Sequence, residues 1–387
     1  MSYDFIIVGA GITGITLAEQ LASKLDKKIL LIEIRNHIGG LCYDFKNDDG
    51  ILIHKYGPHT FHTDSTEVYR YLSSFTNWNM YSHKVVGNID GTLVPLPFNL
   101  ISIDKCLPED ADNIKSVLID KYNVNDKISI FELLDSDDPY LKKLGQYVYE
   151  NVYLHYNEKQ WNCKPEDIDK SIIDRLPIQV SYDCRYHTSI YQGIPSKGYT
   201  HMFEKMLLSP NIDLLLETDY NNLIDIDYEN KEIYYKKELF KGELIFTGMI
   251  DEFFNYKYGH LPYRSTVTIN ETMDKSYFQQ NATINYPNDY HFTRITEYKY
   301  ITGQQIDKTT IQFEYPSEFN PNFEERNMPT YPIINKENVK LYEKYKKLGD
   351  EYKNIIFIGR CAEYKYLDMD MAVYNSLKLV NKRHILK

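Results

Sequence analysis

The pattern of apolar and polar positions is most regular in the first forty residues. The apolar run Phe5–Val8 is typical of a buried parallel strand. Apolar residues from Ile15 to Leu21 are spaced as on an amphipathic helix, which the pattern predicts directly behind that strand. A second apolar run, Lys28–Ile32, predicts another buried strand that ends at Glu33. These elements predict a βαβ unit and hence an α/β fold with a Rossmann-like domain.

The middle of the chain changes its period twice. Apolar residues recur at three- and four-residue spacing in Asn113–Tyr122 and Tyr140–Tyr153, which predicts a small helical domain. Short alternating runs rich in Thr, Tyr, Ile and Phe follow over 182–191 and 263–315, and they predict a twisted antiparallel β-sheet.

A further apolar run, Asn354–Ile358, ends in Gly359-Arg360 and precedes a helical pattern over 371–382. A buried strand so late in the chain predicts that the C-terminus returns to the first sheet. The nucleotide-binding domain is then discontinuous in sequence.

Three glycines follow the first strand, at Gly9, Gly11 and Gly14. The first permits a tight turn, the second lets the backbone approach a pyrophosphate, and the third lets helix and strand pack closely. The helix that begins here points its free N–H groups at the anion. Glu33 lies about twenty residues further on, where a carboxylate accepts the hydroxyls of an adenosine ribose. We therefore expect a dinucleotide cofactor.

The choice between NAD and FAD depends on the residues after Glu33. Arg35 and the pair Gly39-Gly40 would let the chain pass close to the remainder of an extended cofactor. Arg360, at the end of the late strand, fits a second cofactor contact. This combination favours FAD.

The composition excludes several classes of protein. The chain has 387 residues, with 44 Lys and Arg against 55 Asp and Glu, so its net charge is −11. An acidic surface repels phosphate backbones, and we expect no nucleic-acid partner. No apolar run reaches the roughly 20 residues of a membrane span, and no secretory signal pattern is present. The five cysteines are scattered and never spaced as CxxC, which favours a reduced protein of the cytoplasm.

Two groups of polar residues are candidates for chemistry. The segment 54–62 holds three histidines, including His59 and His62; a metal site, surface histidines, and a loop against a flavin are the alternatives, and we favour the loop. We expect no metal. Only nine of the 44 basic residues are arginines, and the planar guanidinium binds phosphate in a bidentate way that lysine does not reproduce. Arginines with apolar or aromatic neighbours are therefore either diphosphate ligands or ordinary surface ion pairs; they are Arg175, Arg264, Arg294 and Arg360.

These residues carry a family resemblance. The chain resembles UDP-galactopyranose mutases of the prokaryotic kind along nearly its whole length. The matching segments are Gly9–Gly14, EIRNHIGG (33–40), HKYGPHTFH (54–62), EKQW (158–161), RLP (175–177), YQGIP (191–195) and the tail from Gly359-Arg360 through AEYKY (362–366) to Asp368.

The resemblance implies three domains, and we assign them to ranges. They are an FAD-binding αβ domain (1–75, 197–250 and 338–387), a helical domain that carries a dimer contact (102–172), and an antiparallel sheet domain that completes the substrate site (76–101, 173–196 and 251–337). It also implies a non-redox isomerisation of UDP-galactopyranose to UDP-galactofuranose in which N5 of reduced FAD attacks the anomeric carbon and UDP departs. A cytoplasmic homodimer in cell-wall biosynthesis, kept reduced by an external donor such as NAD(P)H, is implied as well.

The resemblance assigns roles to individual residues. Arg175 and Arg294 stabilise the diphosphate, Tyr331 and Tyr366 donate hydrogen bonds to it, and His62 lies against the flavin. Tyr156 stacks on uracil, Trp161 lies near the sugar–phosphate end, and Asp368, Tyr186 and Arg264 complete the substrate site. The cofactor contacts are Gly9, Gly11, Gly14, Glu33, Arg35, Gly40, His59 and Arg360.

Several positions depart from the family pattern and leave the sugar open. They are Leu41, Pro58, His155, Asn157, Tyr182, Cys184, His187, Gln280 and Asp370. A mutase acting on UDP-N-acetylgalactosamine or on a dTDP-linked deoxysugar is therefore an alternative. An FAD-dependent oxidoreductase of the amine-oxidase type is another, since it shares the cofactor domain. A protein that binds without catalysis is a third.

Overall fold

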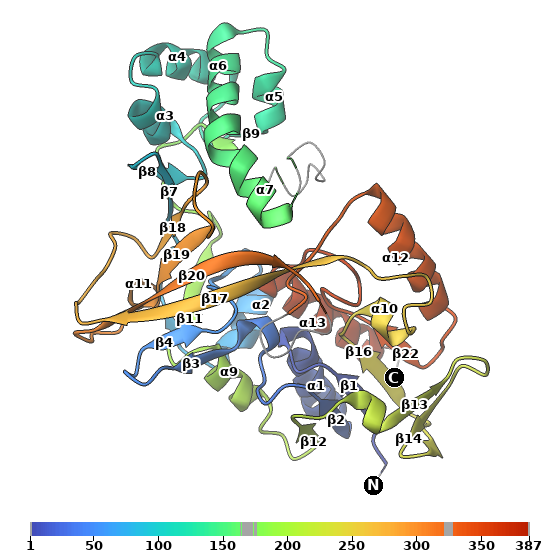
Figure 1. Cartoon of the computed structure of the whole chain (residues 1–387). Helices are drawn as coiled ribbons and strands as arrows, with labels where there is room; N and C mark the ends of the chain where they lie inside the picture. Colours follow the sequence, from blue (N-terminus) through green and yellow to red (C-terminus); the bar gives the residue numbers. More distant parts are fainter. Residues whose placement is uncertain (1, 163, 165–172, 174–175, 321–327, 386–387) are drawn as a thin grey trace.

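The computed structural model describes residues 2–162, 164, 173, 176–320 and 328–385 (Figure 1). Arg175 and Cys163 therefore lie outside the described residues. A sheet with helices on both faces forms the lower part of Figure 1, two long strands cross its middle, and a group of helices stands above them. The boundaries that we assign to the three domains remain a prediction.

The first sheet is parallel and has the strand order of a Rossmann fold. Its order is β12 (Ile212–Leu215), β2 (Ile29–Ile32), β1 (Phe5–Val8), β16 (Glu243–Phe246) and β22 (Ile355–Phe357). The late strand β22 thus returns to the sheet of β1, as its apolar run predicts. The order reverses direction at β1, and ligands of such sheets bind at that point, outside the carboxyl ends of the strands.

Alternate residues of β1 face two different cores. Ile7 packs with α1 (Ile12–Leu25) and α13 (Met369–Ile385), whereas Ile6 and Val8 pack on the side of α10 (Ile250–Phe253) and α12 (Lys336–Gly349). Because both faces of the sheet are covered, its strands are continuous apolar runs. The predicted α/β fold is confirmed.

The second sheet has seven strands. Its order is β21 (Tyr331–Pro332), β17 (Tyr263–Met273), β20 (Thr309–Glu318), β19 (Arg294–Glu297), β18 (Thr283–Asn285), β7 (Val85–Ile89) and β8 (Thr92–Leu96). All neighbours pair antiparallel except β7 and β18, which are parallel. The expectation of an antiparallel sheet is therefore wrong at this one pair, because β7 enters the sheet from a distant part of the chain.

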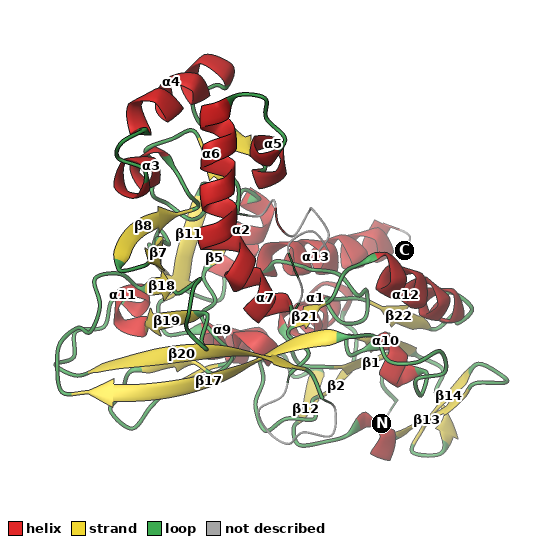
Figure 2. Cartoon of the chain, turned by 45° about the horizontal axis from the view of Figure 1, so that its top comes forward, coloured by secondary structure: helices red, strands yellow, loops and turns green. Residues whose placement is uncertain are grey.

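A helical unit packs on the β7–β8 end of this sheet. Its elements are α3 (Leu100–Cys106), α4 (Ala111–Lys121), α5 (Ile130–Leu134), α6 (Pro139–Val148), the π-helical η2 (Tyr149–Leu154) and α7 (His155–Trp161). Ile114, Leu118 and Leu144 are buried in one core with Val94 of β8. The last three elements run on from one another, so α7 points down from the helical unit towards the crossing strands (Figures 1 and 2).

Shorter elements connect these parts. Small sheets pair β5 (Phe61–Thr63) and β6 (Trp78–Asn79) with β11 (Tyr191–Pro195), β3 (Asp44–Lys46) with β4 (Leu52–His54), β9 (Lys127–Ile128) with β10 (Ile178–Gln179), and β13 (Ile224–Asp227) with β14 (Glu232–Tyr235) and β15 (Glu238–Leu239). The remaining helices are η1 (Gly40–Cys42), α2 (Thr66–Ser73), α9 (Tyr199–Met206), η4 (Tyr220–Asn222) and α11 (Tyr298–Thr302).

The strand predicted over 182–191 is wrong. Only Tyr191 belongs to a strand, β11, and residues 182–190 form bends and loop. Tyr186 lines a cavity and His187 stacks on His62, whereas Tyr182 is exposed, so the aromatic residues of this stretch do not form one face of a sheet. In the described ranges, no helix combines the length and the apolar character needed to cross a membrane.

Candidate active site

A cleft of about 920 Å³ opens at the carboxyl end of β1, at the strand reversal. Ligand pockets commonly have volumes of about 300–1,000 Å³, so the cleft is of a size for an extended ligand. Gly9 and Gly11 form one part of its wall, and Gly39 and Gly40 lie against them through a bridge between Gly11 and Gly39. Two chain segments about thirty residues apart thus meet as bare backbone.

The three glycines of the fingerprint do three different things. Gly9 has φ +100°, and a Cβ there would lie 2.1 Å from Thr247 Oγ1. A Cβ on Gly14 would lie 2.0 Å from the carbonyl oxygen of Gly9, so helix and strand are in direct contact. A Cβ on Gly11 would meet only Gly40 Cα, at 4.0 Å, and would otherwise project into open space. Gly11 therefore keeps space free in the cleft, where a pyrophosphate would lie.

The first turn of α1 is ready to receive an anion. Its N-cap residue is Gly11, which makes no side-chain capping hydrogen bond. The first N–H groups of a helix have no partner within the helix, and they carry the positive end of its dipole. A phosphate group at this point would satisfy them.

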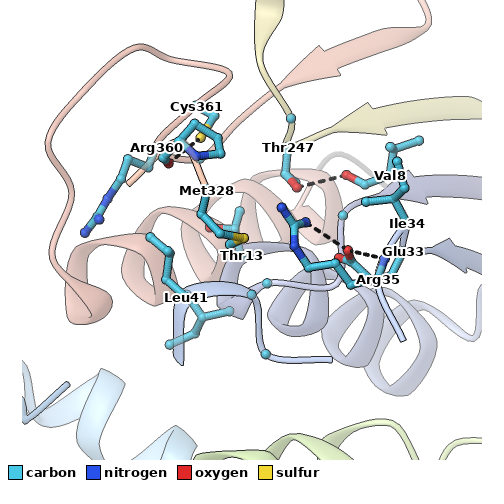
Figure 3. A pocket seen from close by; sticks show the side chains of 18 of the residues that line it. Val8, Thr13, Glu33, Ile34, Arg35, Leu41, Thr247, Met328, Arg360 and Cys361 are labelled. Carbon is cyan, nitrogen blue, oxygen red and sulfur yellow. Dashed lines mark hydrogen bonds and ion pairs between the residues drawn. The ribbon is translucent and has the colours of Figure 1, made fainter. Parts of the chain in front are cut away.

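The end of the cleft where an adenosine is expected contains Glu33 and Arg35. The buried carboxylate of Glu33 accepts hydrogen bonds from the Ala10 N–H (2.9 Å) and from the backbone and side chain of Arg35 (3.0 and 3.1 Å). Figure 3 shows this pair on one side of the cleft and Arg360 on the other. The open space at Gly11, the uncapped helix and the fixed carboxylate together fit a dinucleotide such as FAD.

The other end of the cleft is lined by His59, Arg360 and Asp368. The His59 ring bonds to the carbonyl oxygen of Gly57 through Nδ1 (2.9 Å). Burial, with help from neighbouring charges, lowers the pKa of His59 to about 3, so this ring is neutral at physiological pH. The predicted cofactor residues therefore surround one cleft, apart from Gly14, which packs beneath it.

A second cavity, of about 120 Å³, lies between α7 and the seven-stranded sheet. Predicted substrate residues line it from five separate stretches of the chain; they are Tyr156, Trp161, Tyr186, Arg294, Tyr331 and Tyr366. Asn157, Asn285 and Pro287 also belong to its wall.

Arg294 is the cationic group of this cavity. Its Nη2 donates a hydrogen bond to the Tyr156 hydroxyl (2.9 Å), and its Nε lies 3.5 Å from Oε1 of Glu314. Burial opposes the charge of Arg294, but the Glu314 carboxylate and the surrounding tyrosines outweigh it, and the pKa of Arg294 lies well above its ordinary value. Arg294 and Glu314 are direct partners on β19 and β20, so the sheet register itself creates the ion pair.

Tyr331 and Tyr366 form a stacked pair, with ring centroids 5.5 Å apart and planes 5° from parallel. Trp161 packs beside Tyr331, with centroids 5.8 Å apart. The guanidinium carbon of Arg360 lies 5.2 Å from the centre of the Tyr366 ring and 5.7 Å from that of Tyr331. Arg360 lines the cofactor cleft, so its contact with the two tyrosines joins the wall of the cleft to the wall of the second cavity.

Three residues predicted for the catalytic or substrate site lie outside the cavity wall: Arg264, His62 and Asp368, the last of which lines the cofactor cleft. Arg264 is buried and donates to the carbonyl oxygens of Gln160 (2.9 Å) and Lys159 (3.2 Å), so it holds the end of α7 and is no part of the cavity wall. His62 lines neither cavity; its ring stacks on His187 with centroids 3.6 Å apart. Arg175 lies outside the described residues.

Sequence reasoning missed two residues beside Arg294: its ion-pair partner Glu314 and the cavity residue Asn285. Glu314 alternates with apolar neighbours on β20, but only the pairing of β19 with β20 shows that it faces Arg294. Asn285 lies opposite Arg294 on β18, and its buried side-chain oxygen has no hydrogen-bond partner among the described residues. No short motif marks either residue, because their meeting depends on long-range strand register.

No group of three or more His, Cys, Asp or Glu side chains in the described ranges is arranged to hold a metal ion. His54 is fully buried, and its Nδ1 accepts a hydrogen bond from the His59 backbone N–H (2.9 Å). The histidine-rich segment thus serves the cleft as a folded loop, with His54 as its internal support.

Comparison with known proteins decides the family. A family model described as UDP-galactopyranose mutase matches residues 151–366, and one described as NAD(P)-binding Rossmann-like domain matches residues 7–75. A UDP-galactopyranose mutase of Mycoplasma genitalium is 37% identical, over 97% of this chain and 94% of that protein. The chain belongs to the UDP-galactopyranose mutase family. It is therefore an isomerase by family, and the family implies a flavin cofactor.

Two further matches describe the range of this family and its fold. A dTDP-fucopyranose mutase of Escherichia coli is 32% identical, over 96% of each chain. A crystal structure of reduced UDP-galactopyranose mutase superposes with a TM-score of 0.75 at 16% identity, covering 100% of this chain and 95% of that one, which shows the fold. The family matches do not favour the amine-oxidase alternative.

Proposed function

We propose that this protein interconverts UDP-galactopyranose and UDP-galactofuranose, with reduced FAD held in the cleft at the end of β1. The observation that carries the proposal is the position of Arg294 and its tyrosines in a cavity whose Tyr331 and Tyr366 rings contact Arg360 of the cofactor cleft. A nucleotide diphosphate bound by Arg294 therefore places its sugar towards the flavin. The matched relative from Mycoplasma genitalium, which carries the name of this activity, supports the same conclusion.

The flavin, when bound and reduced, supplies a nucleophilic nitrogen for the anomeric carbon and is recovered unchanged. The chain's own residues bind and orient the substrate. Arg294 neutralises the diphosphate, which gains negative charge as it leaves the sugar. A buried cation that strengthens its interaction as charge develops lowers the barrier as well as the dissociation constant.

Hydroxyl groups complete the diphosphate site. Burial raises the pKa of Tyr331, so its hydroxyl keeps its proton at neutral pH and remains a donor. Tyr366, stacked against it, presents a second hydroxyl at the same wall. Glu314 holds the guanidinium of Arg294 in place from below, since the two groups face each other across adjacent strands. Arg175, by family resemblance, adds a second guanidinium, and its role stays a prediction.

The remaining parts of the proposal concern the sugar, the partners and the compartment. Asn157, which departs from the family pattern, lines the cavity. The sugar preference is therefore best tested with several nucleotide sugars. We further propose a homodimer, supported by the exposed apolar residues Ile119, Val124 and Tyr182 near the helical unit. We also propose NAD(P)H as the external reductant, a role in cell-wall biosynthesis and a cytoplasmic location. The four described cysteines are free thiols, which is expected of a protein in a reducing compartment.

The direct test is turnover under anaerobic conditions. The dithionite-reduced protein is expected to convert UDP-galactofuranose to UDP-galactopyranose, and the oxidised protein is expected to be inactive. UDP-N-acetylgalactosamine and dTDP-fucose, added in parallel, measure the preference for sugar and base. Equal turnover by the oxidised protein, or turnover that consumes an oxidant, would overturn the proposal and favour an oxidoreductase.

A further inference from the structure

Lys159 lies on α7 between cavity residues, yet it is not part of the cavity wall. Its ammonium group instead contacts one loop of the seven-stranded sheet. Nζ donates hydrogen bonds to four backbone carbonyl oxygens, those of Tyr286 (2.6 Å), Asn288 (3.0 Å), Tyr290 (3.1 Å) and Phe292 (3.3 Å). An ammonium group has three N–H donors, so all of them are used and one is shared.

The loop that Lys159 holds joins two residues of the substrate cavity. It connects β18 to β19, with Asn285 immediately before it and Arg294 at the start of the next strand. Pro287, between the first two carbonyl acceptors, lines the cavity itself. A shift of this loop therefore moves the cation that we assign to the diphosphate.

The four acceptors belong to every second residue of the loop. Their carbonyl oxygens converge on one point, since all four lie within 3.3 Å of Lys159 Nζ. Four carbonyl dipoles that converge without a cation would repel each other, and each would lose a hydrogen-bond partner. The loop is thus stable in this form only while a positive group occupies its centre. In the described structure that group is Lys159.

The same two elements are joined inside the cavity, where Arg294 Nη2 donates to the hydroxyl of Tyr156 on α7. Arg264 fixes the end of α7 to β17 through its two backbone contacts. Lys159 is the tie between α7 and the β18–β19 loop. It thereby fixes the side of the cavity that carries Tyr156 relative to the side that carries Arg294.

We infer that Lys159 is a positioning residue for diphosphate binding: it keeps Arg294 and α7 in the relative placement that a nucleotide sugar needs. The inference rests on the proposed function. It assigns to Lys159 an effect on substrate affinity that a lysine with a purely structural role does not have.

The chain offers a matched control in Lys299 on α11. Its side chain is also buried on backbone carbonyl oxygens, those of Ser276 (2.8 Å), Ile306 and Lys308 (3.0 Å). It lines neither cavity. Loss of this ammonium group therefore removes the same kind of contact at a position that does not touch the substrate site.

The test compares Lys159→Met and Lys299→Met as flavin-loaded proteins. We expect both variants to lose thermal stability. We expect only Lys159→Met to weaken UDP binding, measured by calorimetry, by about tenfold, with KM rising more than kcat falls and flavin content unchanged. Lys159→Arg, which keeps the positive charge, is expected to recover most of the affinity. In an Arg294→Ala background, Lys159→Met is expected to have a smaller effect on UDP binding, because only the placement of α7 is then left to lose.

The outcomes separate this inference from the proposed function. UDP binding within twofold of the unmodified protein in Lys159→Met, with stability lost as in Lys299→Met, would overturn the positioning role alone. If Lys159→Met does not fold, Lys159→Gln takes its place, and unchanged affinity in that variant has the same meaning. Failure of the unmodified, flavin-loaded protein to bind UDP would overturn the proposed function and this inference with it.

Discussion

The cofactor cleft and the substrate cavity are neighbours, yet they are built from different parts of the chain. The cleft is largely backbone, in which glycines from two segments meet and a helix N-terminus faces the space between them. The cavity is made of side chains, and its arginine, tyrosines and tryptophan come from positions between 156 and 366. A backbone site depends on a local turn, whereas a side-chain site depends on the register of distant elements.

Removal of Arg294 is expected to produce the largest difference between the substrate cavity and the cofactor cleft. In Arg294→Ala the cavity loses the group that balances the leaving diphosphate, and removal of such a group commonly costs about 100- to 1,000-fold in turnover. We expect at least that loss, with flavin content unchanged, because Arg294 lines only the cavity. Anaerobic kinetics measure the loss of turnover, and the flavin-to-protein ratio measures whether the cleft still holds the cofactor. Near-normal kinetics would remove Arg294 from the mechanism.

Two glycine variants break the cleft in different ways. In Gly11→Leu the side chain enters the cleft without meeting the protein, since a Cβ there finds only Gly40 Cα at 4.0 Å. We expect loss of flavin, with a thermal midpoint equal to that of flavin-stripped protein. In Gly14→Ala the new methyl overlaps the Gly9 carbonyl oxygen, 2.0 Å away, so we expect a lower midpoint even without flavin. Retained flavin in Gly11→Leu would show that the pyrophosphate lies elsewhere.

The same difference between backbone and side-chain sites decides how well the sequence predicts each region. Gly9, Gly11, Gly14 and Glu33 stand at short, fixed spacings, so the cleft could be predicted from local pattern, as could the return of β22 to the first sheet. The sequence did not predict Glu314 and Asn285 as site residues, because their positions beside Arg294 depend on how β18, β19 and β20 pair. The same dependence explains the unpredicted parallel pair of β7 and β18.

A smaller effect is expected from Glu33, which supports the cleft with a side chain. Glu33→Ala removes the carboxylate that we expect to accept the ribose hydroxyls, and a lost hydrogen bond to a charged group costs about 1.5–3 kcal/mol. It also leaves the Ala10 N–H and the Arg35 side chain without their acceptor. We expect flavin affinity to fall about 10- to 100-fold, measured by flavin release on dilution. Asp213→Ala is the control, because this carboxylate of the neighbouring strand bonds to Tyr3 and lines neither cavity. Equal flavin retention in the two variants would contradict the assignment of Glu33.

The mildest test uses the buried imidazoles that flank the two regions. Burial lowers the pKa of His54, His59 and His83 to about 3, against about 6.5 in an unfolded chain. Between pH 6.5 and 3 the unfolded state therefore binds protons that the folded state does not bind. The free energy of unfolding falls over this range as the pH drops, by up to about 1.4 kcal/mol per pH unit for each histidine.

Urea unfolding at a series of pH values measures this dependence. In His83→Gln the free energy of unfolding is expected to depend less steeply on pH, by the equivalent of one bound proton, since one of the three imidazoles is then absent. An unchanged slope in His83→Gln would mean that His83 takes up a proton in the folded state.

The central claim is that the cavity beside the flavin binds a nucleotide diphosphate through Arg294 and the stacked tyrosines. The most direct measurement is a crystal structure of the reduced, flavin-loaded protein with UDP. The account predicts phosphate oxygens within hydrogen-bond distance of the Arg294 guanidinium and of the Tyr331 and Tyr366 hydroxyls. UDP bound elsewhere, with Arg294 still bonded only to Tyr156 and Glu314, would contradict it.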